Sequence, residues 1–239
     1  MRFTYYHLQH SNFVNMKPLH HLGILALLFS FMTSCNSSAK DTQHQPADSI
    51  VRNVLVGGRC EDCNLMYVGM PSNLHATDTS SGWTENGQKL LVTGTVFQKD
   101  GKTPAPNVIM YYWQTDNNGY YSPKEEMDEQ AKRHGHIRGW VKTDEQGRYS
   151  IYTIRPAPYP NSNNPAHIHP LVKELNIDNE YYLDDFVFED DTLLTDDYRK
   201  RLENRGGSGI LEITESGEMQ KAKRDIVLGL NIPGYPDKQ

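Results

Sequence analysis

Short apolar runs, rich in β-branched and aromatic residues, recur along the chain from about residue 51, and polar turn residues separate them. Runs of this length and composition are typical of β-strands. They predict strands at residues 90–97, 108–113, 148–154, 167–172, 210–214 and 225–232. Gly101 and Gly147 lie in two of the polar segments between them, where glycine permits the positive φ of a tight turn.

Two segments carry helical signals instead. Ser122 is followed by a proline and then, three positions after Ser122, by a glutamate, which is typical of a helix start and predicts a helix over residues 122–133. Thr195 predicts the N-cap of a second short helix that runs to Leu202 and ends before two glycines.

Many short strands and few helices predict an all-β fold: an antiparallel β-sandwich, or a barrel, with a few short helices in loops. No repeat and no second domain boundary interrupts residues 51–239, so we expect a single domain there. Residues 192–239 contain a glycine-rich loop and a terminal strand, and they look structural.

The N-terminal 35 residues have the order of an export signal. Lys17 precedes an apolar run at residues 22–32, and small residues follow it. The run is too short for a membrane-spanning helix, and a buried apolar helix is the alternative. Residues 1–15 do not resemble the start of a signal peptide, so we expect translation to begin at Met16.

The signal ends in Met-Thr-Ser-Cys, which resembles a bacterial lipobox with Met in place of the usual Leu. We therefore expect Cys35 to be lipidated and residues 36–50, which are polar and aperiodic, to form a tether. This predicts an exported protein, held on the bacterial cell envelope by a lipid anchor alone. Intact-mass measurement on the membrane fraction tests this, and retained residues 1–34 would contradict it.

Composition excludes one large class of partners. Apolar residues make up 37% of the 239-residue chain and charged residues 23%, as in ordinary globular proteins. The net charge is −6, and no Lys/Arg cluster is present, so nucleic acid is not an expected partner.

If Cys35 carries lipid, Cys60 and Cys63 remain as a Cys-x-x-Cys pair. In an exported protein such a pair favours a disulfide over a partial metal site or a redox centre.

The candidate chemistry begins with two histidines in one predicted strand. His167 and His169 project from the same face of that strand, close enough to bind one metal ion. A pair of histidines without a metal is the alternative.

Tyr121 and Tyr159 lie in nearby turn-rich segments, and Tyr159 stands between two prolines. Two phenolates and two imidazoles suit Fe(III), because a hard, highly charged ion acidifies the phenol. Packing tyrosines are the alternative.

Four blocks of residues, in order, then resemble the intradiol ring-cleavage dioxygenases, over about residues 90–191. The blocks are Trp113 with Gly119-x-Tyr-Ser, Thr143-Asp-x-x-Gly-x-Tyr-Ser, Arg155-Pro-Ala-Pro-Tyr-Pro and Pro165-Ala-His-x-His. The resemblance implies an antiparallel β-sandwich. It also implies an Fe(III) bound by Tyr121, Tyr159, His167 and His169, with a water or hydroxide completing the ligand shell.

The same resemblance implies an activity: cleavage of a catechol-type ring by O2 between its two hydroxylated carbons, with the Tyr159 phenolate acting as a base. The sequence does not identify the aromatic substrate, and an oligomer is possible.

The chain departs from the family pattern at two positions. Asn164 stands where an arginine usually precedes Pro-Ala-His-x-His, and Asp185 stands where the family often has a glutamine. If both face the substrate pocket, they disfavour a developing anion and a carboxylated ring. Arg138 is the candidate that supplies the missing positive charge, the alternative being a surface arginine. These departures keep open a second hypothesis, a non-enzymatic surface module that binds catechols or carbohydrates.

A second His-x-His motif, at His134 and His136, lies in a charged segment with Gly135 between the two histidines. No tyrosine partner accompanies it. We expect these imidazoles to be solvated in a loop.

Overall fold

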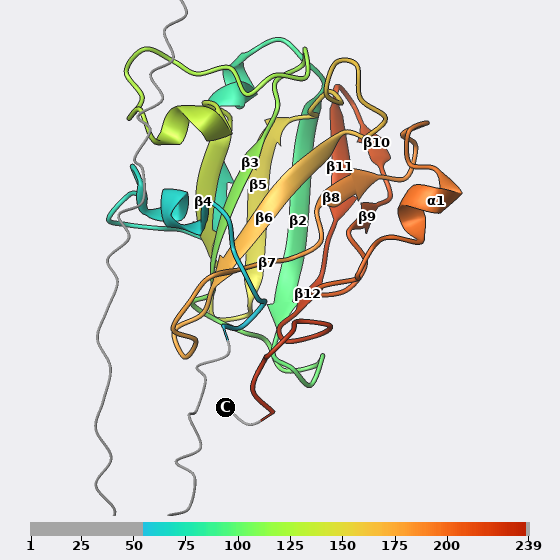
Figure 1. The fold of residues 1–239 in the computed structure, drawn as a ribbon. Coiled ribbons are helices and arrows are strands. Elements are labelled where there is room, and N and C mark those ends of the chain that lie inside the picture. Colours follow the sequence, from blue (N-terminus) through green and yellow to red (C-terminus); the bar gives the residue numbers. More distant parts are fainter. Residues whose placement is uncertain (1–54, 238–239) are drawn as a thin grey trace, which may run out of the picture. The chain divides into compact units, whose positions relative to one another are not determined.

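Two six-stranded β-sheets face each other in the computed structural model, which describes residues 55–237 (Figure 1). The first sheet has the order β1 (Thr77–Thr79), β5 (Arg148–Ile154), β2 (Lys89–Phe97), β11 (Met219–Lys223) and β10 (Thr214–Ser216), with β12 (Ile226–Val227) paired to the end of β2. The second has the order β4 (Arg138–Lys142), β3 (Ile109–Gln114), β6 (His167–Lys173), β8 (Phe186–Phe188) and β9 (Ile210–Leu211), with β7 (Tyr181–Tyr182) paired to β6.

The helical elements of the described residues are short. Three are 3-10 turns: η1 (Cys63–Tyr67), η2 (Ser81–Thr84) and η3 (Ala131–His134). The α-helix α1 (Asp196–Arg199) lies beyond β9 at the margin of the second sheet (Figure 1). Among the described residues, no helix has the length and apolarity needed to cross a bilayer.

The core lies between the sheets, because each central strand turns alternate side chains inward. Leu90 and Val92 of β2, Met110 of β3 and Ile168 of β6 are buried in one apolar cluster. The all-β sandwich is therefore confirmed. Its central pairs β2–β5, β3–β4 and β3–β6 are antiparallel, whereas β1–β5, β2–β11, β2–β12 and β8–β9 are parallel.

The other face of the second sheet carries a separate cluster. Tyr111 and Trp113 alternate with the core residues of β3, and Leu171 does the same on β6. They pack against Cys63 and Met66 of η1, outside the sandwich core. This outer face is where His167 and His169 project, because they share the alternation of Leu171.

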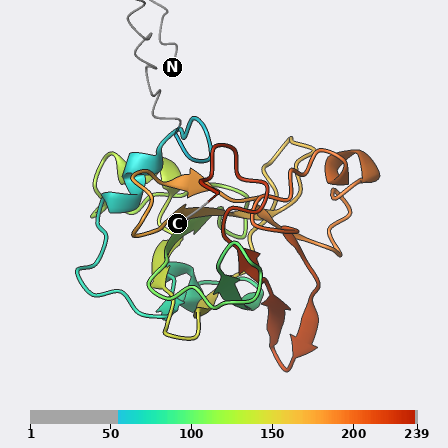
Figure 2. The same ribbon diagram turned by 90° about the horizontal axis from the view of Figure 1, so that it is seen from below.

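The predicted strands agree closely with the structure near the sheet centres and less well in the C-terminal part. Residues 148–154 coincide with β5, while residues 210–214 form two strands, β9 and β10, instead of one. Only Ile226–Val227 of the run 225–232 is a strand. Figure 2 shows the hairpin of β10 and β11, of which β11 was not predicted, at the edge of the first sheet.

The two helix predictions had opposite outcomes. The Thr195 hydroxyl accepts a hydrogen bond from the Tyr198 amide and caps α1, although this helix ends at Arg199 and not at Leu202. The helix over 122–133 was wrong except at its end. The Ser122 hydroxyl donates to Asp116 (2.6 Å) in place of accepting from a helix amide, and only Ala131–His134 forms a 3-10 turn.

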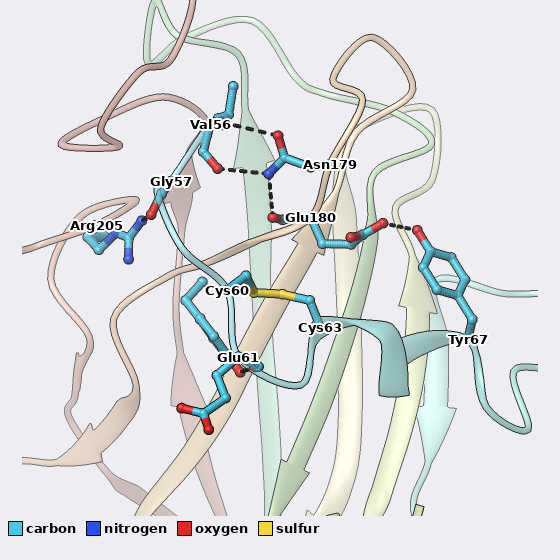
Figure 3. The surroundings of a disulfide bond; sticks show 10 residues. Val56, Gly57, Cys60, Glu61, Cys63, Tyr67, Asn179, Glu180 and Arg205 are labelled. Atoms are coloured by element: carbon cyan, nitrogen blue, oxygen red, sulfur yellow. Dashed lines mark hydrogen bonds between the residues drawn. A yellow bond between two sulfur atoms is a disulfide. The ribbon is translucent and has the colours of Figure 1, made fainter. Parts of the chain in front are cut away.

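A disulfide links Cys60 and Cys63, with 5.7 Å between their Cα atoms (Figure 3). The segment that contains it is tied to β7, because the Tyr182 hydroxyl donates to the Glu61 carbonyl. It is also tied to η3 through a 2.7 Å ion pair between Asp62 and Arg133. The signal peptide, Cys35 and the tether lie outside the described residues and stay predictions.

Candidate metal centre

Four side-chain atoms from three segments converge on the outer face of β6. The Tyr121 hydroxyl oxygen lies 2.5 Å from that of Tyr159 and 2.8 Å from His169 Nε2. The Tyr159 oxygen lies 3.0 Å from His167 Nε2 and 3.4 Å from His169 Nε2. The structure thus brings together the four residues that the sequence predicts as iron ligands.

The two histidines owe their common direction to β6. His167 and His169 are alternate residues of one strand, so both imidazoles leave the same face, and their ring centroids are 4.5 Å apart. The strand is held on both sides, because His169 pairs with Trp113 of β3 and His167 pairs with Val187 of β8. A paired strand is a rigid base for a metal site.

The two tyrosines come from loops that touch each other. The turn before Tyr121 is held by Asp116, whose Oδ1 accepts from the amides of Asn118 and Tyr120. Gly119 has a φ of +84°, and a Cβ on it would lie 2.1 Å from the Pro158 carbonyl oxygen. Only glycine therefore allows this turn to approach the loop that carries Tyr159.

Hydrogen bonds on the opposite nitrogens fix the tautomers of both histidines. His167 Nδ1 lies 2.7 Å from the Pro165 carbonyl oxygen, and His169 Nδ1 lies 2.8 Å from Asp185 Oδ1. These partners only accept, so each Nδ1 carries the proton and each Nε2 presents a lone pair to the tyrosines. This is the arrangement that metal-binding histidines commonly have.

The protonation states without a metal follow from burial. Burial raises the pKa of the Tyr121 phenol, and its hydrogen bond with Tyr159 raises that pKa further. Burial also raises the pKa of Tyr159 and, together with the neighbouring His169, lowers that of His167. Both phenols are neutral in the metal-free protein, so a metal that takes both as ligands must displace two protons.

The four donor atoms fit a single ion. Ligand atoms about 2.0–2.2 Å from one ion and at right angles to each other are separated by roughly 3 Å. The four separations between these atoms given above, 2.5 to 3.4 Å, lie around that value. Two phenol oxygens and two imidazoles are a hard donor set that gives up two protons, which fits Fe(III) better than a softer divalent ion.

Asp185 is near enough to be considered a ligand, because its carboxylate and the two histidines lie within 4.8 Å of one another. Its Oδ1, however, accepts the Nδ1 proton of His169, on the side of the ring opposite Nε2. Burial raises the pKa of Asp185, but the adjacent His169 outweighs it and leaves that pKa below the ordinary value. Asp185 therefore orients His169 as a carboxylate.

A cleft of about 440 Å³ reaches this site along His169 and Asp185. Trp113, Tyr182 and Tyr198 form aromatic parts of its wall. The remaining lining residues are Leu183, Asp184, Arg201, Leu202, Glu203 and Arg205. Asp185 thus lies at the cleft, as predicted for a pocket residue, with its carboxylate already engaged by His169.

The segment 198–205 is part of this cleft, although the sequence assigned it a purely structural role. A tyrosine and two arginines that follow the Thr195 cap were the available signal. Such residues are ordinary on a solvated helix end, so the signal was weak.

Two predicted residues lie elsewhere. Asn164 is exposed in the loop before β6 and is not among the lining residues of the cleft. The Arg138 guanidinium lies over the Tyr111 and Trp140 rings and lines a second cavity of about 400 Å³, which shares no residue with the first. The structure therefore gives Arg138 no place in the cleft beside His169.

The prediction that His134 and His136 are solvated was wrong. His134 is 5% exposed, stacks on Trp113 at 4.1 Å and lies 2.9 Å from the Tyr111 hydroxyl. His136 lies 2.7 Å from Glu85. Both imidazoles are structural. His134 packs against Tyr111 and Trp113, and His136 lies between the Ser122 carbonyl and Glu85.

The chain is similar in sequence to known dioxygenases. A family model described as Dioxygenase matches residues 66–228. Catechol 1,2-dioxygenase of Acinetobacter baylyi is 30% identical over 150 residues, which cover 52% of this chain and 47% of that protein. The protocatechuate 3,4-dioxygenase beta chain of Burkholderia cepacia is 30% identical over 156 residues, covering 59% and 65%. The chain spans about half the length of the catechol 1,2-dioxygenases that it matches.

Two solved structures of dioxygenases are similar to this chain. Catechol 1,2-dioxygenase from an Acinetobacter species has a TM-score of 0.49 and 22% identity, over 67% of this chain and 58% of that one. A dioxygenase domain from a Streptomyces dioxygenase–carbohydrate-binding fusion has a TM-score of 0.47 and 23% identity, over 65% and 87%.

Proposed function

The chain belongs to the intradiol ring-cleavage dioxygenase family, and on that premise we propose that it is a non-haem Fe(III) dioxygenase. Its reaction is the cleavage of a catechol-type ring by O2 between the two hydroxylated carbons. The observation that carries the proposal is the convergence of two phenol oxygens and two imidazole Nε2 atoms within 2.5 to 3.4 Å. The ion they would hold supplies Lewis acidity toward a bound catechol.

The four ligands have unequal surroundings. Tyr121 contacts Tyr159 and His169, whereas Tyr159 contacts Tyr121 and both histidines. The Tyr159 oxygen is thus the most central of the four. We assign it the proton transfer: as a phenolate it accepts the proton of one catechol hydroxyl, which leaves the substrate oxygen free to bind.

His167 and His169 keep their places during such a step, because each is anchored through Nδ1. Asp185 holds the Nδ1 proton of His169 and so increases the electron density at Nε2. The Pro165 carbonyl does the same for His167 with a neutral acceptor. Tyr182, in the aromatic wall of the cleft, offers a partly exposed ring against which a substrate ring can stack, whereas Trp113 is buried between other rings.

The test combines colour with oxygen uptake. The purified protein, supplied with ferric iron, is expected to absorb visible light through tyrosinate-to-iron charge transfer, and to consume O2 when catechol is added. Tyr121→Phe should abolish most of that absorption, because it removes one phenolate ligand. Tyr120→Phe is the matched control, since Tyr120 is the adjacent residue and is 57% exposed.

Each alternative has its own signature. A colourless protein that retains zinc would contradict the iron site. A colour that shifts with catechol, without oxygen uptake, would contradict the enzyme and leave a binding module. Equal loss of colour in both tyrosine variants would contradict the specific role of Tyr121.

A further inference from the structure

The cleft beside His169 contains positive charge that the proposed reaction does not use. Arg201 and Arg205 both line it, from the segment that follows α1. Arg201 is exposed, and its guanidinium carbon lies 5.2 Å from the centre of the Tyr198 ring. Among the described residues, no carboxylate forms an ion pair with Arg201.

The carboxylates of the same cleft are largely committed to other partners. Asp185 accepts from His169 Nδ1 at 2.8 Å. Asp184 accepts from the backbone amides of Asn204 and Arg205, at 2.8 and 3.1 Å. Glu203 is 68% exposed at its side chain and lies 3.8 Å from Arg205 Nε. Three carboxylates therefore line the cleft, and none of them forms an ion pair with Arg201.

Arg205 is held in place rather than free. Its Nη2 donates to the Gly57 carbonyl at 2.7 Å, which ties it to the segment beside the disulfide (Figure 3). Its Nε is buried and has no hydrogen-bond partner among the described residues. Arg205 thus adds fixed positive charge to the wall, while Arg201 is the side chain that can reach a ligand.

The size and lining of the cleft indicate what that ligand is. A volume of about 440 Å³ lies in the range of sites for molecules considerably larger than a single ring. Tyr182 and Tyr198 supply partly exposed surfaces for an aromatic body, and Tyr198 lies under the Arg201 guanidinium. A planar anion beside Arg201 would make charge-assisted hydrogen bonds with its guanidinium.

We propose that Arg201, supported by Tyr198 and Arg205, is a specificity-determining residue that binds a carboxylate carried on an arm of the substrate ring. The preferred substrate is then a catechol with an acidic side chain, such as a 3,4-dihydroxyphenyl-alkenoic acid, instead of bare catechol. This inference rests on the proposed function for its catalytic outcome only, because carboxylate binding is measurable without the metal.

The first experiment uses metal-free protein and a pair of ligands that cannot be cleaved. 4-Hydroxycinnamate and its methyl ester have the same ring and arm, but only the acid is charged. Quenching of tryptophan fluorescence, to which Trp113 in the cleft wall contributes, or calorimetry gives both affinities. We expect the acid to bind at least about ten-fold more tightly than the ester, and Arg201→Gln to remove most of that difference.

Two further variants separate recognition from structure. Arg201→Lys keeps the charge without the planar fork and should retain part of the preference. Arg199→Gln is the matched control, because Arg199 is on α1 and is paired with Glu189 at 2.8 Å, outside the cleft. Equal affinity for acid and ester, or an equal loss in the Arg199 and Arg201 variants, would overturn the proposal.

The second experiment uses the iron-loaded protein. The ratio of kcat/KM for 3,4-dihydroxycinnamate to kcat/KM for catechol should fall about ten-fold in Arg201→Gln, mainly through KM, and stay constant in Arg199→Gln. A protein that cleaves neither compound contradicts the proposed function, and the metal-free binding data then still decide the role of Arg201. Cleavage of both with an unchanged ratio contradicts the role of Arg201 alone.

Discussion

Two His-x-His motifs with the same spacing have different fates in this molecule. His167 and His169 are alternate residues of strand β6, and both Nε2 atoms face the tyrosines. His134 ends the 3-10 turn η3, and Gly135, with a φ of +67°, breaks the alternation that a strand would give to His134 and His136. The spacing permits a metal site, and the backbone conformation between the two histidines decides whether their rings converge.

Their hydrogen bonds differ in the same way. His136 has both ring nitrogens engaged, one near the Ser122 carbonyl (2.5 Å) and one near Glu85 (2.7 Å), so neither nitrogen faces a second potential ligand. His167 and His169 engage only Nδ1 with groups outside the site. A histidine that can bind a metal is therefore recognised by one anchored nitrogen and one that faces other ligands.

The second motif nevertheless supports the first. Gly135 approaches the backbone of Tyr121 so closely that a Cβ would lie 2.9 Å from it. The Trp113 ring stacks on His134, and it also stacks on His169 with 4.8 Å between the ring centroids. His134 and Gly135 thus pack behind two of the predicted ligands.

The largest expected difference between the motifs is in metal binding. His169→Ala removes a predicted ligand and should weaken ferric iron binding by more than about 100-fold, since even the outer partners of ligands contribute 10–100-fold. His136→Ala, the matched change, should leave iron content near that of the unaltered protein. Iron content after dialysis measures both, and comparable losses would show that the motifs are not functionally distinct.

The carboxylate partners provide a smaller and sharper contrast. Asp185→Asn removes the charge behind His169, and we expect iron affinity to fall by about 10–100-fold. Glu85→Gln makes the same change behind His136 and should leave iron affinity unaltered. Competition with a chelator gives both constants. If the Asp185→Asn protein binds iron with unchanged affinity, the hydrogen bond between His169 Nδ1 and Asp185 does not contribute to iron binding.

The last contrast is in stability and not in metal binding, and it concerns pH and the buried histidine of the second motif. Burial, with added repulsion from Arg138, lowers the pKa of His134 to about 3. The unfolded chain binds this proton below about pH 6.5, whereas the folded protein does not until about pH 3. Stability is therefore lost as the pH falls between these values, by up to about 1.4 kcal/mol per pH unit from this group.

His134→Gln should accordingly reduce the slope of unfolding free energy against pH between 6.5 and 3, in denaturant titrations of the metal-free protein. His75→Gln, which alters an exposed histidine, is the control. An unchanged slope in the His134 variant would mean that the imidazole is protonated in the folded state.

Much of the fold could be predicted, because strand signals are local. Apolar residues and turn glycines lie within a few positions of each other, and β5 was predicted with its correct bounds. The helix over 122–133 failed because other segments hold Ser122: its hydroxyl donates to Asp116, and its carbonyl accepts from the His136 amide, fourteen residues along the chain. The short parallel strand β1 carries too little pattern to be recognised alone.

The sequence by itself determined the types of ligand and the common face of His167 and His169, because alternation along a strand is a property of neighbouring residues. Only the tertiary structure decided that Tyr121 and Tyr159 meet those histidines, that Asp185 stands behind one of them, and that Arg201 lines the cleft while Arg138 does not. These contacts join segments far apart in the chain. Their geometry depends on how the two sheets and their loops pack, and no local pattern encodes it.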